Sequence, residues 1–316
     1  GVRCCAWRGG KVGGGWWRPC ERLIRSPGAC FISDECPALS RPEARARVLH
    51  AGKAGPQTVA LRAQLEAMPD GGVFAIHIPK APFRCPPAPY ERACQVAHYF
   101  STRKRKSKII VLDSNEEIQS KKSLFAGAWG SLYKGYIDYR PNSSLVDVDL
   151  ATRTLKLDFE NVTADVINLI PPQRAGAIAR NLGMANANAR FCQVDFLTYE
   201  STAQPGIHLP GDSIQIAPAM PKSGHMANAH AKVAAAAIVA ELSGWDVDPA
   251  PMLTNTCYSF GDPDPAHPVA SVHAYVAART EYETRPGPGG RPRASAASAL
   301  GPPSGGASGL SGPFRL

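Results

Sequence analysis

The strongest constraint on the fold is a strand, a helix and a second strand that follow one another with short links. Val73–Ile78 is apolar, rich in β-forming residues and bounded by glycine and proline, so we expect a strand there. Pro89 opens a predicted helix that continues to about Phe100, because proline is tolerated in a first helical turn. The predicted strand Ile109–Asp113 follows. Strands joined through a helix pair in parallel, so the sequence predicts an α/β fold.

Apolar spacing predicts the remaining elements. Helical spacing of apolar residues occurs between positions 49 and 68, and alternation over 146–159 indicates a hairpin or meander. We also expect three strands and one alanine-rich helix, at Ala164–Ile170, Gly206–Leu209, Val269–Tyr275 and Asn228–Leu242. Proline at position 210 removes a donor from any β-ladder and ends the strand before it.

The positive charge of the chain is concentrated at its two ends. The 316 residues include 35 Lys and Arg against 26 Asp and Glu, a formal net charge of +9, and residues 1–25 and 285–316 carry all of this excess. The body between them is neutral, so we do not expect a nucleic acid as a partner. Both ends are rich in Gly and Arg without apolar periodicity, and we expect them to be non-native, out-of-frame sequence or disordered tails. No apolar run reaches transmembrane length.

Two cysteines stand in distinctive surroundings. Cys85 lies in Phe-Arg-Cys-Pro-Pro-Ala-Pro-Tyr-Glu-Arg-Ala, just ahead of a predicted helix whose free N–H groups favour a thiolate. Glu91 falls in the first turn of that helix, and Cys257 lies in Asn-Thr-Cys-Tyr-Ser. Two unrelated buried thiols are the alternative interpretation, and acidic residues favour first helical turns on electrostatic grounds alone. Cys94 is expected to be a core residue.

Two further motifs lie between the cysteines. Gly211-Asp212 follows the predicted strand 206–209, and Met220-Pro221-Lys222-Ser223-Gly224 precedes the alanine-rich helix. A Gly-Asp pair alone is typical of a turn. His225 and His230 are five residues apart and therefore on different helix faces, so we expect no metal site.

Taken together, these segments resemble the flavoprotein subunit of flavocytochrome c sulfide dehydrogenase, a relative of the sulfide:quinone oxidoreductases. The resemblance runs from about residue 26 to about residue 284. It implies an α/β fold of two dinucleotide-binding-type three-layer domains, the first incomplete, plus a small α+β C-terminal domain. The implied division is a remnant of the FAD-binding domain, a second dinucleotide-binding-like domain, the C-terminal half of the FAD domain and a C-terminal domain, at 26–50, 51–180, 181–248 and 249–284.

The resemblance also implies a site and a reaction. Cys85 and Cys257 correspond to the redox-active pair and Glu91 to an acid/base group near the sulfur. The residues implied to bind FAD are Pro27, Gly28, Gly211, Asp212, Met220, Pro221, Lys222, Ser223 and Gly224. Asp212 would contact the ribityl chain, and the helix after Lys222 would face the pyrimidine end of the flavin. The implied substrate is sulfide, the implied partner is a c-type cytochrome subunit, and the implied location is the periplasm.

Two other interpretations remain open at this stage. The chain could be a quinone- or NAD(P)H-linked flavin disulfide oxidoreductase of the same fold, although Pro79-Lys80-Ala81-Pro82 replaces a glycine-rich nicotinamide loop. It could also be a non-catalytic remnant. No Gly-x-Gly-x-x-Gly follows a predicted strand, since Gly9–Gly15 continues into Trp16-Trp17-Arg18, so we expect weak or no FAD binding by this polypeptide.

Overall fold

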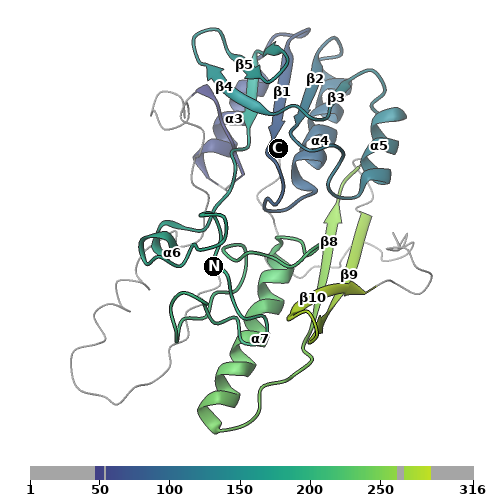
Figure 1. Ribbon diagram of the computed structural model, residues 1–316. Helices are drawn as coiled ribbons and strands as arrows, with labels where there is room; N and C mark the ends of the chain where they lie inside the picture. The colour runs from purple at the N-terminus through teal and green to yellow at the C-terminus, as the bar shows by residue number, and fades with distance from the viewer. Residues whose placement is uncertain (1–46, 53–54, 262–266, 286–316) are drawn as a thin grey trace. The chain divides into compact units, whose positions relative to one another are not determined.

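The structure is a computed structural model that describes residues 47–52, 55–261 and 267–285 (Figure 1). For residues 267–269 the description covers the backbone only. It divides into two compact units. Within the described residues the central unit holds 47–172 and 258–268, and the C-terminal unit holds 173–257 and 269–285. Pro27, Gly28, most of the expected remnant 26–50 and nearly all of both tails lie outside the described residues. The finer domain division stays a prediction.

Four parallel strands in the order β3-β2-β1-β7 form the sheet of the central unit (Figure 1). Their bounds are Val73–Ile78 for β1, Lys108–Asp113 for β2, Ile137–Arg140 for β3 and Val166–Leu169 for β7. Helix α4, Ala88–Arg103, connects β1 to β2. The predicted parallel strand-helix-strand unit is therefore confirmed, with its first strand at the expected bounds.

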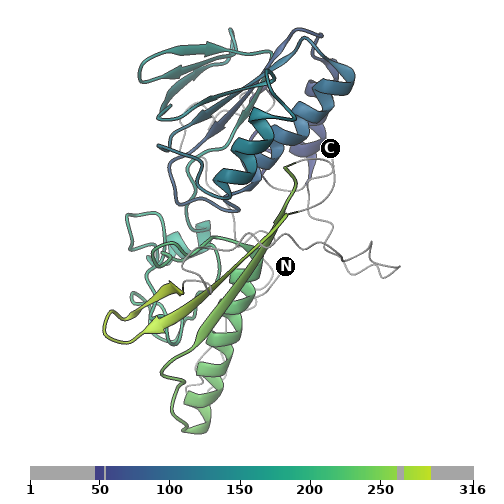
Figure 2. The same cartoon turned by 90° about the vertical axis from the view of Figure 1, so that its right-hand side faces the viewer.

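Helices cover one face of this sheet. They are α3, α4 and α5, of which α3 is Pro56–Ala67 and α5 is Lys122–Gly130. Successive side chains of a strand point to opposite faces, and in β1 Phe74, Ile76 and Ile78 pack into the core that includes the helices. Figure 2 shows these helices along one side of the strands. The helix expected between residues 49 and 68 is thus confirmed as α3.

A three-stranded antiparallel meander covers the other face. It consists of β4 (Leu145–Asp149), β5 (Thr154–Leu157) and β6 (Asn161–Thr163). Its Val148, Leu155 and Val162 join one core cluster with Ala75 and Leu112 of the parallel strands. The expected meander over 146–159 is confirmed, and the central unit has three layers.

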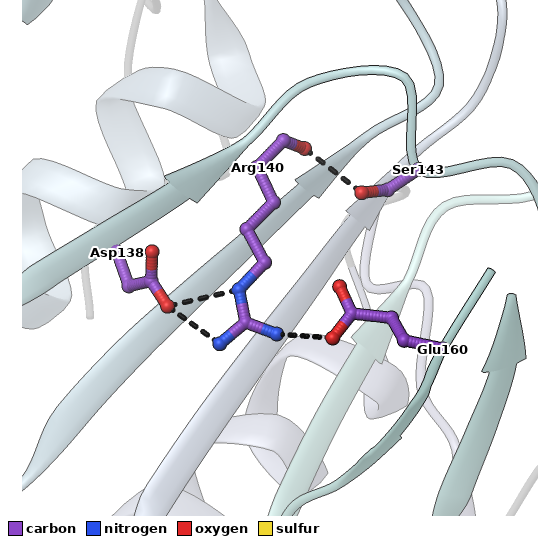
Figure 3. Close-up of polar contacts among 4 residues, drawn as sticks. All are labelled: Asp138, Arg140, Ser143 and Glu160. Carbon is purple, nitrogen blue, oxygen red and sulfur yellow. Dashed lines mark hydrogen bonds and ion pairs between the residues drawn. The ribbon is translucent and has the colours of Figure 1, made fainter.

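An arginine connects the edge strand of the sheet to this meander. Arg140, the last residue of β3, donates through Nε and Nη2 to Asp138 Oδ2, at 2.9 and 2.6 Å, and through Nη1 to Glu160 Oε2 at 2.7 Å (Figure 3). Its carbonyl accepts the Ser143 hydroxyl at 3.1 Å. The pKa of Arg140 is raised, mainly by its hydrogen bond to Asp138. These carboxylates are partly exposed, so each pair adds at most about 1 kcal/mol to stability.

The C-terminal unit is built on one long helix and a small antiparallel sheet. Helix α7, Gly224–Ser243, contains the expected helix and ends at Gly244, whose φ of 70° suits a residue without a Cβ. The other elements are α6 (Ala177–Asn181), β8 (Met252–Ser259), β9 (His267–Val276) and β10 (Glu281–Arg285), with the sheet order β10-β9-β8. The last two residues of β8 and the first two of β9 are counted with the central unit. The strand expected near Val269–Tyr275 is confirmed as part of β9.

The strand expected at 206–209 is wrong. His208 makes a single isolated bridge to Glu200, and no regular strand forms. Gly206 has a φ of 78° and Tyr199 a φ of 59°, so the backbone leaves the extended region on both sides of that bridge. The mixed α/β class itself is confirmed. None of the helices in the described ranges is long and apolar enough to cross a membrane.

A buried histidine makes the central unit sensitive to acid. His77 in β1 is 3% exposed, its Nε2 lies 3.1 Å from Ser114 Oγ, and burial lowers its pKa to about 4. The unfolded chain binds a proton near pH 6.5 while the folded chain does not, so stability falls as the pH drops from 6.5 toward 4. The total loss expected from this group is about 3 kcal/mol.

Urea unfolding of the wild type and of His77→Asn at pH 7 and pH 4 measures this effect. We expect the variant to lose about 3 kcal/mol less than the wild type over that interval. His98→Asn is the matched control, because His98 is an exposed histidine of α4. Equal losses in the wild type and His77→Asn would contradict the prediction.

Candidate functional site

Cys85 lies in a stiff loop at the carboxyl end of β1. The loop from Pro79 to Pro87 contains no glycine, and Cys85 adopts a φ of 52°, which is uncommon for a residue with a side chain. Asn115, just after β2, holds the start of the loop: its Nδ2 donates to the Pro79 carbonyl at 3.0 Å and its Oδ1 accepts the Ala81 N–H at 2.9 Å. The Cys85 carbonyl accepts the Ala88 N–H at 2.9 Å, which places Cys85 directly before the first turn of α4.

A buried arginine lies near this sulfur. Arg92 is 6% exposed, and its guanidinium donates to Asn168 Oδ1 at 2.7 Å and to the Ala51 carbonyl at 2.8 Å. Burial lowers the pKa of Arg92 to about 10, while the negative charges of Cys85 and Glu91 oppose this shift. The arginine is therefore still a cation at neutral pH. A cation beside a cysteine favours the thiolate, which is the reactive form.

Glu91 is half-buried in the first turn of α4. Burial raises the pKa of its carboxyl above the ordinary value. Four groups act in the opposite direction: the Phe260 N–H, the Lys121 charge, the Ser259 hydroxyl and the Arg92 charge, in decreasing order. Glu91 thus holds its proton to a higher pH than a free carboxyl does, in a setting where nearby donors can also stabilise its anion.

Lys121 and Ser259 complete this arrangement within the central unit. Lys121, the residue before α5, has a φ of 53°, and its Nζ donates to Ser259 Oγ at 2.9 Å. Ser259 is fully buried. A Cβ added to Gly261 would lie 2.8 Å from Leu124 Cδ1, so the segment 259–261 packs closely against α5. We call Glu91, Arg92, Lys121 and Ser259, with the Phe260 N–H, the Glu91 cluster.

The sequence did not single out Arg92, Lys121 or Ser259. One signal for Arg92 was available, because it is four residues before Val96 and so on the apolar face of α4, where an arginine requires internal partners. Nothing local marks the other two. Cys94, expected in the core, is confirmed there, where its Sγ accepts the Trp129 Nε1–H at 3.2 Å.

Cys257 belongs to β8 and is half-buried. It falls in the C-terminal unit, whereas Cys85 falls in the central unit. The pairing of the two sulfurs therefore stays a prediction. In the sequence Cys257 stands two residues before Ser259 of the Glu91 cluster.

The Gly211-Asp212 turn is anchored in the C-terminal unit. Gly211 has a φ of 85°, and a Cβ there would lie 3.2 Å from the Ala227 Cβ of α7, so glycine is required for both conformation and space. Its N–H donates to His230 Nδ1 at 3.2 Å. Burial, with smaller effects of Lys222 and His273, lowers the pKa of His230 to about 3, so this histidine is a neutral acceptor.

Lys222 holds the same turn from the other side. It is 2% exposed, and its Nζ donates to the Asp212 carbonyl at 2.8 Å and the Ile214 carbonyl at 2.7 Å. The ammonium also lies 3.9 Å from the centroid of the Phe191 ring. Lys222 thus fixes the backbone that presents Asp212.

The first turn of α7 is capped by Ser223 and has open space at Gly224. The Ser223 hydroxyl accepts the Met226 N–H at 3.0 Å and donates to Asn255 Oδ1 at 2.5 Å. A Cβ added to Gly224 would meet nothing within 4 Å. Met220 is buried and Pro221 half-buried just before Lys222. The predicted residues 211–212 and 220–224 are thus brought together around one helix end, while their contact with a flavin stays a prediction.

These residues suit the pyrimidine end of a flavin. Reduction places negative charge on that end of the ring, and a helix N-terminus with a buried cation beside it stabilises such charge. The open space at Gly224 gives access to the helix end. In the described ranges no group of three or more His, Cys, Asp or Glu side chains is arranged to hold a metal ion.

Two family models match parts of this chain. Residues 58–171 match the family model of the central domain of the sulfide dehydrogenase (flavocytochrome c) flavoprotein chain, and residues 249–301 match that of the flavin-binding domain of flavocytochrome c sulphide dehydrogenase. Together they cover more than half of the chain. The family is one of flavin-dependent oxidoreductases, and its flavin is FAD.

Some solved structures resemble this chain at low sequence identity. A chain in the Tetrahymena thermophila mitochondrial ATP synthase matches with a TM-score of 0.51 and 16% identity, over 70% of this chain and 54% of that chain. A pyridine nucleotide-disulfide family oxidoreductase from Enterococcus faecalis gives 0.48 and 12%, over 79% and 62%. An NAD-dependent persulfide reductase from A. fulgidus gives 0.47 and 12%, over 78% and 50%.

The chain spans only about half to three fifths of the length of these solved proteins. At such identities the likeness concerns the fold alone, and the family models carry the assignment. Because the two family models together match more than half of its residues, this chain belongs to the flavocytochrome c sulfide dehydrogenase flavoprotein family.

Proposed function

We propose that this chain is part of an FAD-dependent sulfide dehydrogenase in which Cys85 and Cys257 form the redox-active pair. The observation that carries the proposal is the Glu91 cluster, which contains a carboxyl with a raised pKa, six residues after Cys85, and a buried arginine cation whose charge interacts with Cys85. Thiol–disulfide chemistry at Cys85 is favoured by a cation that stabilises its thiolate, and Glu91 is an acid/base group close to it in sequence.

The proposed reaction begins when hydrogen sulfide loses a proton and its sulfur attacks a disulfide. The Glu91 carboxylate accepts a proton from hydrogen sulfide, and the hydrosulfide attacks one sulfur of the Cys85–Cys257 disulfide. The S–S bond breaks, one cysteine keeps a persulfide and the other leaves as a thiolate carrying the bonding electron pair. Arg92 stabilises negative charge at Cys85. When bound, FAD would supply the acceptor for the two electrons that the persulfide and the thiolate release, together with one proton, as they join through the added sulfur atom.

The electrons are then transferred to a partner protein. We propose a c-type cytochrome subunit as the acceptor, in the periplasm, because the matched family is named for a flavocytochrome c. In the C-terminal unit, Gly211, Asp212 and the start of α7 would hold the ribityl chain and pyrimidine end of the flavin. Lys222 keeps the turn at 211–214 in place for that contact.

A nicotinamide-linked reaction is the second candidate, and Asp113 argues against it. In dinucleotide-binding domains an acidic residue at the end of the second strand binds the adenosine ribose. Asp113 ends β2 but is fully buried, and its oxygens accept from Tyr90 Oη at 2.7 Å, Tyr139 Oη at 3.0 Å and the Asn115 amides at 2.7 and 3.0 Å. It has no oxygen left for a ribose.

The test is anaerobic reduction of the chain reconstituted with FAD, followed at the flavin absorbance band. We expect sulfide to bleach the flavin and NADH to leave it oxidised. Reduction by NADH alone would favour the nicotinamide-linked reaction. A folded chain that takes up no flavin would favour a non-catalytic remnant.

A further inference from the structure

We propose that Lys121 is a positioning residue for Glu91. It directs the only proton of the Ser259 hydroxyl onto the Glu91 carboxylate and places a positive charge beside that carboxylate. In this way Lys121 sets the pH at which Glu91 exchanges its proton. This inference deepens the proposed function, because it names the group that tunes the acid/base residue. Nothing in the family match assigns a role to Lys121.

The direction of the hydrogen bonds follows from their chemistry. An ammonium has donors only, so Lys121 Nζ donates to Ser259 Oγ, at 2.9 Å. The hydroxyl has a single proton, and this proton is then available for the carboxyl of Glu91, with which Ser259 is hydrogen-bonded. Because Ser259 is fully buried, water does not compete for that hydroxyl.

Lys121 lies at the entrance to α5 with a φ of 53°, in the left-handed region, where glycine and asparagine are the common residues. From that position its side chain reaches the segment 259–261, which is pressed against Leu124 of the same helix through Gly261.

The charges that act on Glu91 come from two elements. Arg92 is its neighbour in α4, and Lys121 precedes α5; the Ser259 hydroxyl and the Phe260 N–H add uncharged donors from the end of β8. Arg92 is committed to Asn168 and Ala51. Lys121 is the stronger of the two charges in its effect on the Glu91 pKa. Its removal leaves the effect of burial less opposed, so the proton is held to higher pH.

The experiment is a titration of the Glu91 carboxyl by ¹³C NMR in the full chain with labelled glutamate, assigned by the signal that Glu91→Gln removes. We expect Lys121→Met to raise the midpoint by about one pH unit or more, because an opposite charge at close range shifts a carboxyl by that amount. Lys121→Arg, which keeps charge and donors, should restore most of the difference. Lys122→Met is the matched control, since that exposed neighbour pairs with Glu117 at 2.5 Å.

Two outcomes would overturn the proposal: a midpoint that Lys121→Met leaves unchanged, or one that Lys122→Met moves equally. If Lys121→Met does not fold by circular dichroism, Ser259→Ala decides, because loss of the directed hydroxyl must also raise the midpoint and an unchanged midpoint refutes the mechanism. The titration requires neither FAD nor sulfide. Its failure is therefore distinct from failure of sulfide-driven reduction.

Discussion

Replacing Cys257 by serine should abolish reduction of bound FAD by sulfide. The serine hydroxyl cannot form a disulfide, so hydrosulfide has no S–S bond to attack and no thiolate is released. We expect the rate of flavin bleaching to fall about 10³-fold or more, as happens when a covalent nucleophile is lost. Anaerobic stopped-flow absorbance measures the rate.

Two comparisons make this result specific. Cys85→Ser should lose activity to the same extent, because both sulfurs belong to one bond. Cys192→Ala is the control for a cysteine whose sulfur takes no part in the proposed reaction, since Cys192 is a core residue of the C-terminal unit. Its backbone bridges to Ile214 beside the Gly211-Asp212 turn, and the substitution leaves that bridge in place. A Cys257→Ser protein that still bleaches at the wild-type rate would eliminate the disulfide mechanism while leaving the fold assignment intact.

The largest expected effect on stability comes from Asp113→Ala. This buried carboxylate accepts four hydrogen bonds, from Tyr90, Tyr139 and two N–H groups of Asn115. Alanine would leave those donors without an acceptor in the interior, at a cost of about 1 to 3 kcal/mol for each buried group that finds no new partner. We expect the free energy of unfolding to fall by about 4 kcal/mol.

Urea unfolding followed by circular dichroism measures this loss. Asp138→Ala is the matched control, because Asp138 is a partly exposed carboxylate of β3 whose contact is the surface ion pair with Arg140. Its expected cost is at most about 1 kcal/mol. Losses of similar size in both variants would mean that the Asp113 interactions are weaker than their burial indicates.

The parts of the fold that could be predicted are those with strong local signals. Three elements are predicted by their own sequence: β1 by its apolar run, α4 by the proline that opens it and α7 by its alanine-rich sequence. Their observed bounds agree closely with the predicted ones. Helix α5 contains Gly127 and Gly130 and buries only Phe125 and Ala128, so its periodicity is weak. The edge strand β3 is four partly exposed residues and gives little pattern.

The candidate site could be predicted in part, for a different reason. Cys85 stands directly before α4 and Glu91 lies in the first turn of that helix, so a local sequence pattern is enough to relate them. Ser259 is 138 residues from Lys121, and the contact between them depends on how a late segment packs against an early helix. No rule based on residue spacing predicts a contact between residues so far apart in the sequence. Residues 211 and 222 are also separated in sequence, but they resemble known motifs, and this brought them into the prediction.

The burial of Asp113 also bears on how this domain could change in evolution. Its carboxylate is a structural support shared by Tyr90 and Tyr139, and the nearby loop from Pro79 to Pro87 has no glycine to let a pyrophosphate approach. Dinucleotide binding at this position would require new residues in that loop and new partners for both tyrosines at the same time. Each single step would weaken the domain before any benefit appeared, so a stability barrier opposes such a change of cofactor.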